Sequence, residues 1–176
     1  MSELDLSIVV PVFNEADNLA ALHREIDASL TPNALAFEVL YVDDGSTDAS
    51  PRVLAELAAS DPRIRIRRLS RNCGQTAALA AGFRVARGRI IGTLDADLQN
   101  DPADLPHLLS ELDHADIVCG IRTERHDSWL RRFSSRLANS VRNRLTAESV
   151  TDVGCSLRVF RAHLVRDLPL FTGMHR

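Results

Sequence analysis

The chain has 176 residues, of which 45% are hydrophobic and 26% charged, as in an ordinary soluble globular domain and unlike disordered, collagen-like or coiled-coil chains. This length supports one hydrophobic core, so we expect a single domain over residues 1–176. All 21 basic residues are Arg, which excludes chemistry that needs a Lys, and the net charge of -3 gives no reason to expect nucleic-acid binding.

Apolar segments rich in β-branched residues alternate along the chain with segments of helical periodicity. In chain order, strands are predicted at residues 6–13, 37–42, 64–69, 89–94 and 116–121, and helices between them at residues 16–29, 48–59, 76–86 and 104–112. This alternation predicts an α/β fold with an open, mostly parallel sheet flanked by helices.

A basic amphipathic helix is predicted over residues 128–146. Apolar side chains recur there at helical spacing, from Leu130 to Leu145, and residues 121–144 contain seven Arg and only two acidic residues. An apolar stripe of this kind usually belongs to the core of a protein. The concentration of Arg favours contact with a membrane surface instead.

The N-terminal residues and the cysteines do not indicate secretion. The first residues are acidic, and no apolar run approaches the roughly 18 to 20 residues that cross a bilayer. Cys73, Cys119 and Cys155 are widely spaced, which predicts neither disulfides nor a zinc site, and we expect them to be small buried side chains. We therefore expect a cytoplasmic protein that is not an integral membrane protein.

Polar loops follow four successive predicted strands. They comprise residues 14–15, 43–48, 71–75 and 95–99. In open α/β sheets, ligands bind beyond the carboxyl ends of the strands. These loops are therefore expected to form one functional edge of the sheet.

The fourth loop contains two carboxylates at the end of an apolar strand. Asp95 and Asp97 are two residues apart, and Gln99 follows two residues later. Mg²⁺ and Mn²⁺ prefer oxygen ligands and are usually held by one or two carboxylates together with substrate phosphates. These side chains therefore predict a metal site that a diphosphate completes. The alternative is that Asp97 or Asp101 only caps the next helix.

The second loop is also acidic and allows two interpretations. Asp43 or Asp44 can accept hydrogen bonds from the N–H groups of a nucleobase or from ribose hydroxyls. Alternatively, the loop is an acidic turn in which Ser46 or Asp48 caps the following helix. Its position beside a second acidic loop favours ligand binding.

The first and third loops are less informative when each is considered alone. Residues 11–15 can simply end a strand and place an acid at the start of a helix. Residues 71–76 form a turn before a helix whose first N–H groups can meet a phosphate or remain solvated. Only the combination of loops indicates a particular chemistry.

In combination, these segments resemble the motifs of family 2 glycosyltransferases, specifically the polyprenyl-phosphate hexosyltransferase branch that includes dolichol-phosphate mannosyltransferase. The resemblance rests on residues 11–15, 42–48, 72–82, 94–102, 120–125 and 152–158. It implies a GT-A (Rossmann-like) fold, a nucleotide-diphosphate sugar, Mg²⁺ or Mn²⁺, and inverting transfer of a hexose-type sugar to a polyprenyl (undecaprenyl or dolichyl) phosphate. It also implies that this chain is truncated at its C-terminus relative to the family.

The resemblance assigns roles to residues at matching positions. It implies that the metal is bound by Asp95, Asp97 and Gln99. It implies that the nucleotide sugar is bound by Pro11, Asn14, Glu15, Asp43, Asp44, Asn72, Gly74 and Asp95. The acceptor phosphate matches Arg122, Arg131 and Ser135, and Asp152 matches an acidic position near the reaction centre, which makes it a catalytic candidate with Asp95 and Asp97.

These residue types suit transfer to a phosphate. A phosphate monoester has a second pKa of about 6 and already carries a nucleophilic oxyanion at neutral pH, so Arg side chains can position it without a general base. A lipid acceptor would place the enzyme at the inner face of the membrane. Two alternatives are a family 2 enzyme that glycosylates a saccharide hydroxyl and a nucleotide-sugar-binding fragment without turnover. A phosphoacceptor receiver domain is disfavoured because it normally needs a Lys.

Overall fold

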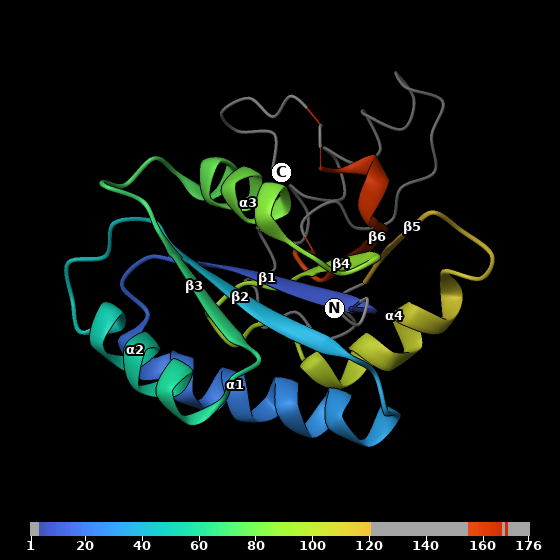
Figure 1. Ribbon diagram of the computed structural model, residues 1–176, viewed down its shortest axis with the longest axis horizontal. Coiled ribbons are helices and arrows are strands. Elements are labelled where there is room, and N and C mark those ends of the chain that lie inside the picture. Colours follow the sequence, from blue (N-terminus) through green and yellow to red (C-terminus); the bar gives the residue numbers. More distant parts are fainter. Residues whose placement is uncertain (1–3, 121–154, 167, 169–176) are drawn as a thin grey trace, which may run out of the picture.

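The structure is a computed structural model that describes residues 4–120, 155–166 and 168. Within these residues, six strands form one sheet in the order β3-β2-β1-β4-β6-β5 (Figure 1). The strands are β1 (Leu6–Val12), β2 (Phe37–Asp43), β3 (Ile64–Arg68), β4 (Ile90–Thr93), β5 (Ile117–Cys119) and β6 (Arg158–Arg161). β1 to β4 pair in parallel, and β6 pairs antiparallel with both β4 and β5. The predicted open, mostly parallel sheet is thus confirmed.

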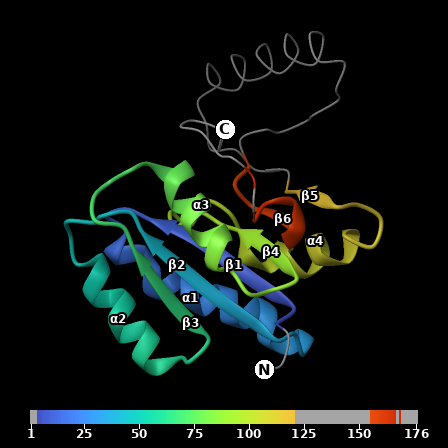
Figure 2. The ribbon, with the colours of Figure 1, turned by 45° about the horizontal axis from the view of Figure 1, so that its top comes forward.

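Helices cover both faces of this sheet, as the two views show (Figures 1 and 2). One face carries α1 (Ala16–Leu30), α2 (Ser50–Ser60) and α4 (Leu105–Glu111), and the other carries α3 (Gln75–Val85). None of the helices in the described part of the chain has the length and apolar character needed to cross a membrane.

The central strands read as continuous apolar runs because both of their faces are buried. Along β1, Ile8 and Val10 join the core beneath α1, whereas Val9 faces the core beneath α3. Gly82 of α3 lies directly over β1, where a Cβ would overlap Val9 Cγ1. The glycine therefore lets α3 approach the sheet closely. The first turn of α3 then lies beside the strand ends.

The predicted elements agree with the structure except at some boundaries and in one strand. The helix predicted from residue 48 begins at Ser50, because the Asp48 side chain instead accepts a hydrogen bond from the Ser50 backbone N–H at 2.9 Å. β6 was not predicted, and it lies between β4 and β5. It consists of Val159 and Phe160 with one Arg on each side. A pattern of four residues is too short to identify a strand. The helix predicted at 128–146 lies outside the described residues.

Candidate functional site

A cleft of about 320 Å³ lies where β1, β2 and β4 end. All four predicted loops contribute to its lining, which consists of Pro11, Val12, Phe13, Glu15, Asp44, Asn72, Gly74, Gln75, Asp95, Ala96 and Asp97. Most of the residues assigned to the nucleotide sugar are therefore brought together, and the two that do not line the cleft are Asn14 and Asp43. The four loops therefore surround one cavity, at the edge of the sheet where they were expected to meet.

Asn14 joins the first loop to the second instead of lining the cleft. Its backbone is left-handed, with φ of 57°, a conformation that Asn tolerates better than most residues. Its side-chain Oδ1 accepts hydrogen bonds from the backbone N–H groups of Thr47 at 2.8 Å and Asp48 at 3.3 Å. Its own N–H donates to Ser46 Oγ at 3.0 Å. Asn14 thus holds the second loop, which forms one wall of the cleft, without lining the cleft itself.

Asp44 joins the second loop to the third and also lines the cleft. Asp44 as a whole is 3% exposed, and its carboxylate accepts hydrogen bonds from the backbone N–H groups of Cys73 at 2.7 Å and Gly74 at 2.8 Å. The two loops touch through their backbones at Gly45, where a Cβ would lie 2.5 Å from the Arg71 carbonyl carbon. Gly45 and Gly74 both have positive φ, which favours glycine. Asp44 therefore sets the position from which α3 begins.

Asp43 is buried beside the cleft and does not line it. Its Oδ1 accepts a hydrogen bond from the Ser46 backbone N–H at 2.9 Å. Its Oδ2 lies 3.1 Å from Arg68 Nε, which is close enough for an ion pair but not aligned for a hydrogen bond, so this buried oxygen has no hydrogen-bond partner. The structure thus separates two adjacent acids that the sequence could not rank: Asp44 reaches the cleft, and Asp43 does not.

The loop after β4 contributes the two carboxylates expected to bind a metal. Asp95 Oδ1 accepts a hydrogen bond from Gln75 Nε2 at 2.6 Å, so the first residue of α3 orients this carboxylate. Asp97 Oδ1 accepts the backbone N–H of Gln99 at 3.1 Å, which tightens the loop. The helix-capping alternative holds for Asp101, whose side chain accepts the N–H two residues later at 2.8 Å.

The residues present fit a divalent ion that is shared with a phosphate ligand. Asp95 and Asp97 both line the cleft and supply the hard oxygen atoms that Mg²⁺ and Mn²⁺ prefer. Among the residues that the structure describes, no group of three or more His, Cys, Asp or Glu can hold a metal by itself. Gln99 does not line the cleft. A two-carboxylate set matches an ion completed by a diphosphate better than a closed protein cage.

Two contacts in this region were missed by the sequence interpretation. One is the Gln75 amide bonded to Asp95, although Gln75 belongs to a loop that was singled out. The other ties the β4 loop to the residues before β6: Asn100 Nδ2 donates to Ser156 Oγ at 2.8 Å, and Thr93 Oγ1 donates to the Ser156 carbonyl at 2.7 Å. Both contacts join residues at least twenty positions apart, so no local pattern reveals them.

Some predictions are corrected, and others lie outside the described residues. The expectation that all three cysteines are buried was wrong, because Cys155 is buried but Cys73 and Cys119 are exposed. Cys73 lies in the loop that Asp44 holds, and Cys119 lies on β5, an edge strand. The acceptor-phosphate residues and the acidic residue near the reaction centre lie outside the described residues and stay predictions: Arg122, Arg131, Ser135 and Asp152.

Comparisons with known proteins agree with the fold. Residues 7–168 match the family model for glycosyl transferase family 2. The chain belongs to glycosyltransferase family 2. This family 2 chain is 41% identical to a dodecaprenyl-phosphate galacturonate synthase of Rhizobium johnstonii, over 100% of its own length and 53% of the relative's. It is 42% identical to an undecaprenyl-phosphate 4-deoxy-4-formamido-L-arabinose transferase of Edwardsiella ictaluri, over 92% and 50% of the two lengths.

Solved structures of glycosyltransferases share the GT-A fold of this family 2 chain. One is a mannosyltransferase of Pyrobaculum calidifontis in complex with GDP-Man and Mn²⁺, with a TM-score of 0.72, 24% identity, and coverage of 97% of this chain and 48% of that one. Another is a glucosyl-3-phosphoglycerate synthase of Mycobacterium tuberculosis with Mn²⁺, UDP and phosphoglyceric acid, with a TM-score of 0.72, 19% identity, and coverage of 92% and 57%. The chain spans about half the length of the curated relatives it matches.

Proposed function

We propose that the chain is the catalytic part of an inverting, metal-dependent glycosyltransferase that transfers a hexose-type sugar from a nucleotide-diphosphate sugar to a polyprenyl phosphate. The names of the two relatives contain dodecaprenyl and undecaprenyl phosphate, which supports this acceptor class. One name also contains an arabinose derivative, so a pentose is the alternative sugar. A membrane-embedded acceptor supports action at a membrane surface, and the proposal places the enzyme on the cytoplasmic side, at the inner face.

One observation carries this proposal. Two carboxylates from the β4 loop, Asp95 and Asp97, line the same cleft as the loop that Asp44 holds at the start of α3. Such a cleft can take a nucleoside diphosphate between the strand ends, with the phosphates near the β4 loop. The two Mn²⁺-containing neighbours support a divalent ion, Mg²⁺ or Mn²⁺, held by Asp95 and Asp97.

The residues of the chain bind and orient the reactants. When bound, a divalent ion would supply positive charge that stabilises the phosphate leaving group. Gln75 keeps the Asp95 carboxylate turned toward α3 by a hydrogen bond of 2.6 Å. The predicted acceptor-phosphate residues, Arg122, Arg131 and Ser135, would hold the acceptor phosphate by its oxygen atoms, and Asp152 would lie near the reaction centre.

The proposed reaction is a single displacement at the anomeric carbon of the sugar. A phosphate oxygen of the lipid forms a bond to this carbon as the bond to the diphosphate breaks, and the electron pair of that bond leaves with the nucleoside diphosphate. A single displacement inverts the anomeric configuration. No proton has to be removed, because the second pKa of a phosphate monoester is about 6.

The test replaces each proposed metal ligand by its amide. Asp95→Asn and Asp97→Asn should each lower sugar transfer to undecaprenyl phosphate by at least about 100-fold, because the leaving group loses its stabilising charge. The measurement is the formation of labelled lipid product with Mn²⁺ or Mg²⁺. Asp113→Asn is the matched control, since Asp113 is exposed and lies outside the cleft. Both cleft variants should keep the melting temperature of the unsubstituted protein.

Other outcomes would contradict the proposal in distinguishable ways. Near-normal transfer in either cleft variant, with unchanged metal dependence, would remove the metal assignment. A glycosylated saccharide formed without lipid phosphate would identify a hydroxyl acceptor. A nucleotide sugar that raises the melting temperature in the presence of Mn²⁺, with no transfer to any acceptor, would identify a binding fragment.

A further inference from the structure

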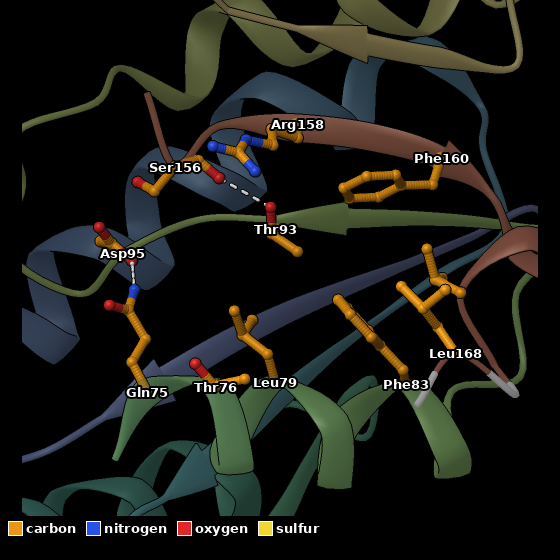
Figure 3. Close-up of a pocket in the computed structure, with 11 residues that line it drawn as sticks. Gln75, Thr76, Leu79, Phe83, Thr93, Asp95, Ser156, Arg158, Phe160 and Leu168 are labelled. Carbon is orange, nitrogen blue, oxygen red and sulfur yellow. Dashed lines mark hydrogen bonds between the residues drawn. The ribbon is translucent and has the colours of Figure 1, made fainter. Parts of the chain in front are cut away.

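A second pocket, of about 190 Å³, opens beside the cleft between α3, β4 and β6 (Figure 3). The two cavities share Gln75 and Asp95. The lining of the second one comes from α3, from β4 and the loop after it, and from residues 156–168. Of the residues assigned to the nucleotide sugar, Asp95 is the one that lines this pocket.

Figure 3 shows that this pocket has a polar end and an apolar end. Polar side chains gather at one end: Gln75, Asp95, Ser156 and Arg158. Apolar side chains gather at the other end: Phe83, Phe160 and Leu168. The rings of Phe83 and Phe160 meet edge to face, with centroids 6.2 Å apart, and so hold each other in place at the apolar end. The pocket therefore fits a small amphiphile with its polar group turned toward the cleft.

The size of the pocket limits the apolar part of such a ligand. An apolar protein cavity of about 150 Å³ binds benzene, which has six carbon atoms. A pocket of about 190 Å³ therefore has room for a group of similar size, such as one five-carbon isoprene unit, together with part of a polar head. It has no room for a sugar and its hydroxyl shell at the apolar end, where the lining supplies no polar partners.

The charge at the polar end suits an anion. Arg158 is the cationic side chain in the described lining of the pocket, and its Nε donates to the Cys155 carbonyl at 2.9 Å, which fixes the orientation of the guanidinium. A guanidinium can bind a phosphate through two parallel hydrogen bonds. Arg158 lies at the end of the pocket nearest Asp95, so a phosphate there would stand at the opening to the cleft.

We propose that this pocket binds the isoprene unit next to the phosphate of the lipid acceptor, with Arg158 beside that phosphate. This inference rests on the proposed transferase function and specifies how its acceptor is recognised. The rest of the polyprenyl chain would leave the pocket, and the phosphate would face the cleft beside the hydrogen-bonded Gln75–Asp95 pair, which lines both cavities. Recognition would thus depend on the first isoprene unit as well as on the phosphate.

The test fills the pocket from α3. Leu79 lines it and is half-buried, so Leu79→Trp can occupy the space of the isoprene unit without disrupting the core. This variant should raise the KM for undecaprenyl phosphate by about tenfold or more, because the isoprene unit loses its apolar contacts in the pocket. The Kd for the nucleotide sugar should change less than about twofold. Leu57→Trp, at a half-buried Leu of α2 on the other face, is the matched control and should change neither.

A binding experiment separates failure of this inference from failure of the proposed function. The probe is dimethylallyl phosphate, a single isoprene unit on a phosphate, titrated into the protein by calorimetry with inorganic phosphate as the comparison. Dimethylallyl phosphate should bind at least about tenfold more tightly than inorganic phosphate, because only dimethylallyl phosphate fills the apolar end of the pocket. Leu79→Trp and the milder Leu79→Gln should both remove that difference.

Each result bears on one claim. Equal binding of the two phosphates, or an unchanged KM for undecaprenyl phosphate in both Leu79 variants, would overturn the pocket assignment while leaving the transferase intact. Tight, Leu79-dependent binding of dimethylallyl phosphate supports the pocket even when no lipid product forms, and the missing product would then overturn the proposed function.

Discussion

Strand β2 carries a buried carboxylate near each end, and the two carboxylates differ in their hydrogen bonds. Near its amino end, Glu38 accepts hydrogen bonds from Ser7 Oγ at 2.7 Å, the Arg87 backbone N–H at 2.8 Å and Arg65 Nη1 at 3.0 Å. At its carboxyl end, Asp43 has one oxygen without a hydrogen-bond partner. Both side chains belong to residues that are 1% exposed. Near its amino end the strand therefore has an acid whose two oxygens both accept hydrogen bonds, and it ends with an acid whose Oδ2 has an ion pair but no hydrogen bond.

This difference suggests that the two edges of the sheet have different tasks: the amino edge contributes to stability, and the carboxyl edge contributes to ligand binding. A buried polar network with all its partners in place holds the structure, whereas incomplete pairing and unusual backbone conformations tend to occur at functional sites. Two of the described non-glycine residues with positive φ, Asn14 and Leu98, lie in loops around the cleft. We therefore expect changes at the amino edge to lower stability, and changes at the carboxyl edge to lower affinity.

The largest expected effect follows from replacing Glu38 by its amide. In Glu38→Gln, the new NH₂ group takes the place either of Oε2, facing Arg65 Nη1, or of Oε1, facing the Arg87 backbone N–H, so in both orientations a donor faces a donor in a buried site. We expect the free energy of unfolding to fall by about 3 kcal/mol, measured by urea denaturation with an unchanged m value. Glu111→Gln, at an exposed position of α4, should change it little. If the free energy of unfolding falls no more in Glu38→Gln than in this control, the amino edge of the sheet does not contribute to stability in the way described.

The next effect is the loss of stability in acid at the amino edge. Hydrogen bonds from Arg63, opposed in part by burial, lower the pKa of Asp61 to about 2, against an ordinary value of 3.8. Since the folded-state pKa is the lower one, unfolding takes up a proton in acid, and the stabilisation is complete above about pH 5 and lost as pH falls toward 2. The lowered pKa of Glu38, where hydrogen bonds outweigh burial, acts in the same direction.

We expect the Asp61 carboxyl to account for about 2 kcal/mol of the stability lost in acid. Urea unfolding measured in a pH series from about 6 to 3 should show about half of this loss, and Asp61→Asn should show a flatter profile. An identical pH dependence in the variant would mean that other carboxyls dominate. In that case the pairing of Asp61 with Arg63, at 2.7 Å, contributes little to folding.

The sequence predicted the layers of the fold and the location of the cleft, because both follow from local patterns. Continuous apolar runs identified the buried strands, and polar residues after those runs identified the loops that meet at one edge. Asp95 and Asp97 could be selected for the same reason, since two acids at a strand end stand out from an apolar context. The structure brings them to the lining of the predicted cleft.

Contacts between distant residues could not be predicted in this way. The clamp that Asn14 makes on the second loop depends on a left-handed backbone and on partners more than thirty residues away. His23 lies between Asp61, at 3.2 Å from its Nε2, and Tyr41, at 3.3 Å from its Nδ1. This buried cluster joins three separate elements and lies away from the cleft. Residue types alone would not reveal either arrangement.

The smallest expected effect concerns the two acids at the end of β2, and it tests which of them shapes the cleft. Asp44→Asn retains one acceptor but turns an NH₂ group toward the Cys73 or Gly74 N–H, so the third loop loses half of its anchor. We expect the Kd for a nucleotide sugar to rise about tenfold, or about 1.4 kcal/mol. The free energy of unfolding should fall by about 1 kcal/mol.

Asp43→Asn is the matched control, with the same chemical change one residue earlier. It keeps the acceptor for the Ser46 N–H and loses only attraction to Arg68, whose side chain is 59% exposed, so the stability should change by less than about 1 kcal/mol. Because Asp43 does not line the cleft, the Kd should stay the same. The reverse result, with affinity lost in Asp43→Asn and retained in Asp44→Asn, would mean that the unmatched oxygen of Asp43 reaches the nucleotide after a shift of the second loop. The affinity for the nucleotide sugar would then depend on a hydrogen bond that the ligand makes to Asp43. It would not depend on the third loop being held in place by Asp44 before the ligand binds.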